Sequence, residues 1–75
     1  MKEGKAVILF PTSAHVMRAE KLIKRAGFWC RLIPVPRHMS SDCGVCLVIQ
    51  AGNAAAARGI LDDGRVDFED LKDYT

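Results

Sequence analysis

The residues best suited to chemistry lie near the middle of the chain, where Cys43 and Cys46 form a C-x-x-C spacing. A thiolate is the reactive form of cysteine, and two thiols at this spacing can cycle between dithiol and disulfide. In redox proteins the motif opens a helix, whereas here Gly44 leads into the apolar run Val45–Gln50, which is typical of a strand. Side chains three apart along a strand point to opposite faces, so a Cys43–Cys46 disulfide requires a turn at Cys43-Gly44.

The three cysteines differ in their sequence surroundings. Cys30 and Cys46 lie in apolar, strand-like segments, and we interpret both as small buried residues, with Cys46 kept as the candidate second thiol. Cys43 follows a polar stretch and is the candidate reactive group. The residues that could support it in the same loop are Arg37, His38, Ser40, Ser41, Asp42 and Gly44.

The charges beside Cys43 allow two interpretations. Arg37 and His38 could lie near the thiol and favour the thiolate, or they could be ordinary solvated loop charges. A structural zinc site needs four ligands, and Cys43, Cys46 and His38 supply three at irregular spacing. We therefore predict no metal site and no cofactor.

Length and charge narrow the classes of protein. A chain of 75 residues allows one domain, residues 1–75, with any site on a loop or in a shallow groove. Residues 1–60 carry a net charge of +6 and residues 61–75 a net charge of −4. The five aromatic residues are not interleaved with the basic ones, so a nucleic-acid partner is not expected. No membrane span or secretory signal is recognisable, and the odd number of cysteines fits a reducing cytoplasm.

The pattern along the chain predicts alternating strands and helices. The expected strands are 6–10, buried on both faces, 29–33, 45–50, and a short fourth strand within 65–73 that includes the alternating Val66-Asp67-Phe68. The expected helices are 14–26, capped by Thr12-Ser13 and ended by Gly27, and 54–63, capped by Asn53, weakened by Gly59 and ended by Gly64. On the first helix the expected inner face holds His15, Ala19, Leu22, Ile23 and Ala26.

This order predicts an α+β fold of the ferredoxin-like type, βαββα(β), with two helices on one face of an antiparallel sheet. The other face of the sheet would then be open and apolar, since two short helices cannot cover all the strand side chains. We therefore expect a homo-oligomer, most simply a two-fold dimer, with Trp29, Arg31 and Ile33 on one face of the second strand. The rival expectation is that the C-terminal segment folds over this face in the monomer.

The central segment carries a family resemblance. The run Arg31-Leu32-Ile33-Pro34-Val35-Pro36-Arg37, followed by Ser40-Ser41-Asp42-Cys43-Gly44, is similar to that of short microbial proteins of the selenium/sulfur (Se/S) carrier-like family. The similarity extends over nearly the whole chain, from Pro11-Thr12-Ser13 and Arg18–Leu22 onward. Cys46 stands where these proteins usually have a small apolar residue, which agrees with its interpretation as a buried side chain.

The resemblance implies a carrier that holds a persulfide or perselenide on Cys43 and exchanges it with donor and acceptor proteins. Such a protein is a carrier or binding protein rather than a turnover enzyme. The alternative from another class is an interaction or regulatory module without chemistry at Cys43. A dithiol oxidoreductase that uses Cys43 and Cys46 is a third hypothesis.

Overall fold

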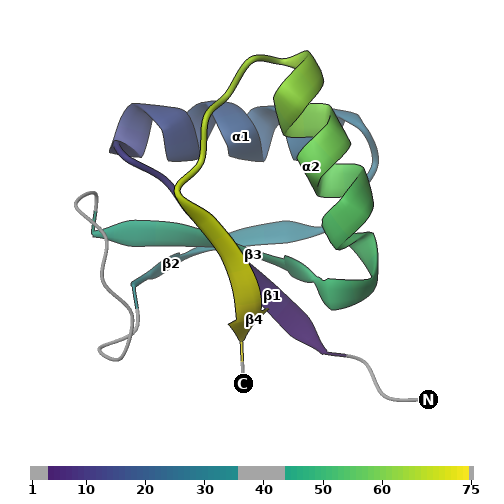
Figure 1. Cartoon of the computed structure of the whole chain (residues 1–75), viewed down its shortest axis with the longest axis horizontal. Coiled ribbons are helices and arrows are strands. Elements are labelled where there is room, and N and C mark those ends of the chain that lie inside the picture. The colour runs from purple at the N-terminus through teal and green to yellow at the C-terminus, as the bar shows by residue number, and fades with distance from the viewer. Residues whose placement is uncertain (1–3, 36–43, 75) are drawn as a thin grey trace.

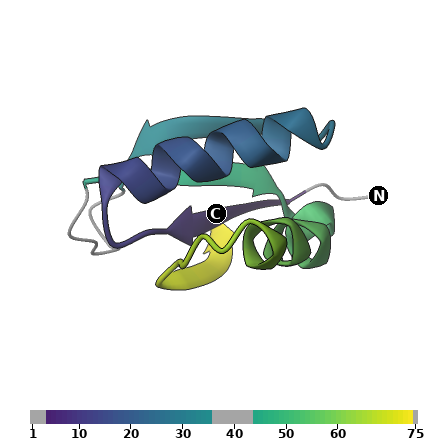
Figure 2. The same cartoon turned by 90° about the horizontal axis from the view of Figure 1, so that it is seen from above.

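The computed structural model describes residues 4–35 and 44–74. Its elements are β1 (Lys5–Leu9), α1 (Ser13–Arg25), β2 (Cys30–Pro34), β3 (Val45–Gln50), the 3₁₀ helix η1 (Ala51–Asn53), α2 (Ala54–Asp63) and β4 (Asp70–Tyr74). The strands form one antiparallel sheet in the order β2-β3-β1-β4. Both helices lie on the same side of this sheet (Figures 1 and 2). The predicted α+β, ferredoxin-like arrangement is confirmed.

The first strand occupies the centre of the sheet, as its continuous apolar run predicts. β1 pairs with β3 on one side and with β4 on the other. Alternate side chains of β1 therefore enter two different apolar clusters. Ala6 and Ile8 face the helices, while Val7 and Leu9 lie in a second cluster on the other side of the sheet.

The helix α1 begins and packs much as its sequence predicts. Thr12 is the N-cap, and its Oγ1 accepts a hydrogen bond from the His15 backbone N–H at 3.2 Å. The residues of α1 that are fully buried are Val16, Ala19 and Ile23. Of the residues predicted for the inner face, Ala19 and Ile23 are buried, His15 is half-buried and Ala26 is exposed. The prediction did not include Val16, which is buried.

The helix α1 ends in a Schellman motif that requires a left-handed residue. The Gly27 N–H donates to the Lys24 carbonyl at 3.0 Å, and the Phe28 N–H donates to the Ile23 carbonyl at 3.1 Å. Gly27 has a φ of +91°, a conformation in which a side chain costs about 1 to 2 kcal/mol. The predicted helix-ending role of Gly27 is confirmed by this geometry.

Two exposed glycines should respond in opposite ways to the same substitution. Gly27→Ala is expected to lower the free energy of unfolding by about 1 kcal/mol, because a Cβ there meets no neighbouring atom and only the backbone is strained. Gly59→Ala, inside α2 and equally open, should raise it by about 0.5 to 1 kcal/mol. Urea unfolding followed by circular dichroism measures both. Two changes of the same sign would contradict this account of Gly27.

The expectation of an open apolar face on the sheet is wrong. The cluster on the side away from the helices consists of Val7, Leu9, Cys46 and Val48, with Ile33 and Val35 packed against it. Its four central members are at most 4% exposed in the single chain. Of the residues that motivated a dimer, Trp29 remains substantially exposed, at 45%. The single chain therefore exposes far fewer apolar side chains on this face of the sheet than the sequence suggested.

The C-terminal segment differs in detail from the prediction. Val66 and Phe68 alternate like strand residues, yet both lie before β4 and pack against the cluster under the helices. The strand itself begins at Asp70, where pairing with Leu9 of β1 becomes available. β4 extends the edge of the sheet rather than folding over its face (Figure 1). In the part of the chain described, no helix is long and apolar enough to span a bilayer.

Candidate functional site

The candidate site lies at the connection between β2 and β3. These strands pair antiparallel up to Pro34 and Val45, and beyond this pair the Val35 N–H donates to the Gly44 carbonyl at 3.1 Å. This hydrogen bond brings the two ends of the connection together where β2 ends and β3 begins. The connection is therefore a hairpin loop with a closed base, which fixes where the predicted site segment is attached.

The predicted site residues fall mostly within this connection. Arg37, His38, Ser40, Ser41, Asp42 and Cys43 lie outside the described residues, and Gly44 lies within them. Gly44 is exposed and has a φ of +76°, a left-handed conformation that favours glycine. The chain therefore turns at Gly44 immediately before it enters β3.

Cys46 is a core residue of β3, as predicted. Its side chain is 0% exposed and lies in the cluster on the helix-free side of the sheet. It is paired in register with Leu9 and Ile33, so its immediate cross-strand neighbours are apolar. A small side chain of this kind suits the packing of this cluster.

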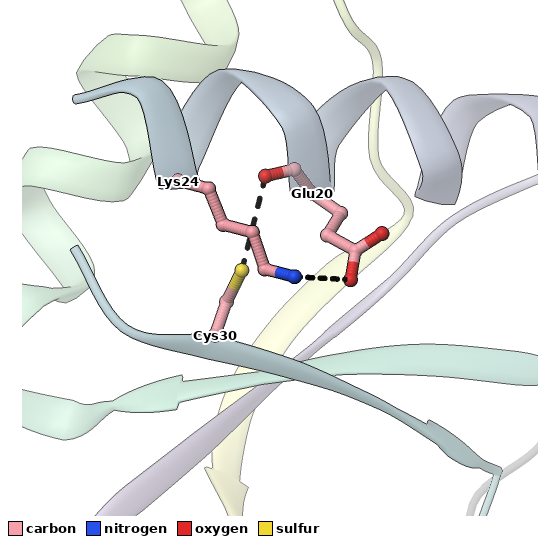
Figure 3. Close-up of polar contacts among 3 residues, drawn as sticks. All are labelled: Glu20, Lys24 and Cys30. Atoms are coloured by element: carbon pink, nitrogen blue, oxygen red, sulfur yellow. Dashed lines mark hydrogen bonds and ion pairs between the residues drawn. The ribbon is translucent and has the colours of Figure 1, made fainter. Parts of the chain in front are cut away.

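Cys30 is also buried, but on the opposite side of the sheet. It is 6% exposed and packs in the cluster beneath the helices. Its Sγ donates to the Glu20 backbone carbonyl at 3.8 Å, beside an ion pair of 3.1 Å between Glu20 and Lys24 (Figure 3). Burial raises the pKa of the Cys30 thiol; nearby Lys24 lowers that pKa and Glu20 raises it, both by less than burial does. Cys30 is thus held as a neutral, hydrogen-bonded thiol.

This environment predicts a slow reaction of Cys30 with iodoacetamide. In the folded protein at pH 7.5, alkylation of Cys30 should be at least about tenfold slower than in the urea-unfolded chain, because the reagent must await a local opening. The raised pKa adds to this protection, and the protection should weaken as the pH rises and the thiolate forms. Peptide mapping after timed quenching gives the rate. Equal rates in the folded and unfolded chain would contradict the burial of Cys30.

Cys30 and Cys46 cannot serve as a redox pair with each other. In the β2–β3 register Cys30 lies opposite Ile49, and Cys46 lies opposite Ile33, so the two cysteines are offset along the ladder. They also belong to clusters on different sides of the sheet. A disulfide needs Cα atoms within about 7 Å and Cβ atoms that face each other, which this arrangement does not provide.

The chain matches the family described as "Putative Se/S carrier protein-like" over residues 5–72. The chain belongs to this family. The match covers all the elements up to the middle of β4 and includes the β2–β3 connection. The family resemblance seen in the sequence is therefore confirmed. No curated protein and no solved structure matches the chain.

The two cysteines within the described residues, Cys30 and Cys46, are both buried. No group of three or more cysteine, histidine or acidic residues within residues 4–35 and 44–74 is arranged to hold a metal ion. Sequence reasoning alone missed the placement of Cys30 beneath Glu20 and Lys24, since these residues meet only when α1 packs on β2.

Proposed function

We propose that this protein carries sulfur or selenium as a persulfide or perselenide on Cys43. The observation that supports this proposal best is the exclusion of the other two cysteines. Cys30 and Cys46 fill positions in the two apolar clusters, one on each side of the sheet, and both are at most 6% exposed. The family description names sulfur or selenium carriage, and Cys43 is the remaining thiol that could perform it.

The transfer step needs no cofactor and leaves the overall redox state unchanged. The Cys43 thiolate attacks the terminal sulfur of a donor persulfide, R–S–SH. A new S–S bond forms on Cys43 while the donor S–S bond breaks, and the donor leaves as its thiolate and takes up a proton. The product is Cys43–S–SH. The selenium reaction follows the same balance with selenium as the terminal atom, and a second thiolate removes the atom by the reverse sequence.

The scaffold has a modest task in this reaction. It must attach the loop firmly, favour the thiolate and leave room for a donor protein and then an acceptor protein. The hydrogen bond between Val35 and Gly44 provides the attachment. Arg37 and His38, close to Cys43 in sequence, are the candidate cations that could favour its thiolate. Because the atom is held rather than consumed, the protein acts as a stoichiometric carrier in the reducing cytoplasm.

Intact mass spectrometry tests the proposal directly. The reduced protein is incubated with a small-molecule persulfide donor, desalted and weighed. We expect a gain of one sulfur atom per chain that disappears in Cys43→Ser and persists in Cys30→Ala and Cys46→Ala. The alanine variants are matched controls that remove the other two thiols one at a time.

Three results would decide against this role. A sulfur adduct that maps to Cys30 or Cys46 would assign the carrier to another residue. A Cys43–Cys46 disulfide as the main product of mild oxidation, with no persulfide, would favour the dithiol oxidoreductase. The absence of any adduct with sulfur and selenium donors alike would favour an interaction module without chemistry at Cys43.

A further inference from the structure

A small hollow lies between α1 and the turn that follows α2, well away in sequence from the cysteine loop. It has a volume of about 160 Å³ and is lined by Ala14, His15, Arg18, Arg65 and Val66. Both helices lie on one side of the sheet, and the turn after α2 passes beside α1 (Figures 1 and 2). Two arginines and a histidine from two different segments thus line one concavity.

The conformation of Arg65 is the unusual feature of this hollow. The helix α2 ends in a Schellman motif, with the Arg65 N–H donating to the Asp62 carbonyl at 3.1 Å and the Val66 N–H donating to the Leu61 carbonyl at 2.9 Å. The left-handed position of this motif belongs to Arg65, whose φ is 57°. The equivalent position at the end of α1 is Gly27. An arginine here carries a backbone cost that glycine would avoid, which points to a use for its side chain.

The basic side chains of the hollow lack acidic partners in the described part of the chain. The ion pairs there join Lys24 to Glu20 and Lys72 to Asp70. Arg18 Nη2 makes one long hydrogen bond, 3.4 Å, to the Gly64 carbonyl, which leaves most of its donors available. The acidic side chains nearest in sequence to Arg65 are exposed and do not line the hollow.

His15 can add a third donor. Its Nδ1 lies 2.6 Å from Thr12 Oγ1, the same oxygen that accepts from the His15 backbone N–H. When the Thr12 hydroxyl donates to Nδ1, the proton of the neutral imidazole is on Nε2, and this N–H is available to a ligand. The first turn of α1 contains no acidic residue that would repel an anion.

We propose that the hollow lined by His15, Arg18 and Arg65 binds a tetrahedral oxoanion of the phosphate type. Guanidinium groups match such an anion through paired, charge-assisted hydrogen bonds. The anion is either free in solution or the phosphoryl group of a nucleotide. This site is independent of the proposed reaction at Cys43, since it involves no cysteine and none of the residues of the β2–β3 connection.

Phosphate titration followed by two-dimensional ¹⁵N NMR tests the site. Sodium phosphate is compared with sodium chloride at equal ionic strength on the full-length protein. We expect phosphate alone to shift the amide signals of Ala14, His15, Arg65 and Val66 in a saturable manner. A parallel titration with adenosine monophosphate, with adenosine as its control, separates the two sources. Tighter binding of the nucleotide identifies a phosphoryl group, and equal or weaker binding identifies the free anion.

The variants separate anion binding from folding. Arg65→Gly removes the guanidinium but suits the left-handed backbone, so it should keep the fold while weakening phosphate binding by about tenfold or more. Arg25→Gln removes an exposed cation from the far end of α1 and should leave the dissociation constant within about twofold. If Arg65→Gly unfolds, Arg65→Asn serves instead, since asparagine tolerates this φ. Shifts that chloride reproduces, or that survive the loss of Arg65, would overturn the site.

Discussion

Phe10→Ala is expected to lower the free energy of unfolding by about 3 to 5 kcal/mol. Phe10 directly follows β1, is 0% exposed, and is the largest of the fully buried side chains. Its ring meets that of Phe68 edge-to-face, with centroids 6.5 Å apart and planes at 70°. This contact joins the end of β1 to the irregular segment before β4. Truncation removes the buried ring and leaves a cavity that neighbours from two segments cannot readily fill.

Because the protein is small, this loss of unfolding free energy is a large share of its total stability. Domains are stable by about 5 to 15 kcal/mol, and one of 75 residues lies toward the lower end. Urea unfolding at 25 °C should therefore show Phe10→Ala largely unfolded or close to its midpoint without denaturant. Met17→Ala, on the outer face of α1 with a side chain 63% exposed, is the control and should change stability by no more than about 0.5 kcal/mol. A loss below about 1 kcal/mol for Phe10→Ala would mean that the Phe10–Phe68 contact does not anchor this end of the core.

The elements with strong local signals could be predicted from sequence. The apolar run ending at Phe10 identified the central strand, because a strand buried on both sides is typically a continuous apolar run without alternation. The second helix was predicted with its exact bounds, Ala54–Asp63. Asn53 occupies its N-cap position but makes no side-chain cap hydrogen bond, because the chain enters α2 through the 3₁₀ helix η1.

The start of β4 depends on its pairing with β1, which the local sequence pattern does not show. Val66 and Phe68 alternate like strand residues, yet the ladder with β1 begins only at Asp70. Both side chains still pack against the core. The alternation of apolar and polar residues here therefore indicated burial correctly, but it did not indicate a strand. The helix-free face was misjudged for a related reason. The sequence shows which side chains leave the sheet on that side, but not how Ile33 and Val35 pack beside the central four.

The candidate site was predictable to different degrees. The apolar run of β3 was enough to place Cys46 in the core, and its 0% exposure confirms this. The role of Cys43 remains a prediction from the sequence and the family. The hollow at Arg65 was not foreseen, because Arg18 and Gly64 are 46 residues apart. The available signal was an arginine directly after Gly64, at a helix end where a left-handed residue is required.

Leu9→Asp is expected to unfold the protein at pH 7 at every protein concentration. Leu9 is 3% exposed in the cluster on the helix-free side of the sheet, so the change removes an apolar side chain worth about 1.5 to 3 kcal/mol and buries a carboxylate. Its cross-strand neighbours are Cys46 and Asp70, which offer no cation and add a like charge. Circular dichroism at several protein concentrations should show loss of secondary structure throughout.

Trp29→Asp introduces the same side chain at an exposed position and should leave the fold intact. Trp29 is 45% exposed, and Lys5 Nζ lies 5.8 Å from its ring centroid, so the new carboxylate has a cation nearby. If the protein forms the predicted dimer through the sheet face that carries Trp29, Trp29→Asp should reduce its sedimentation to that of the 8.3 kDa monomer. The pair of variants separates the two explanations of the apolar strand residues. Should Leu9→Asp instead remain folded and lose only self-association, Leu9 would be an interface residue rather than part of the core of each chain.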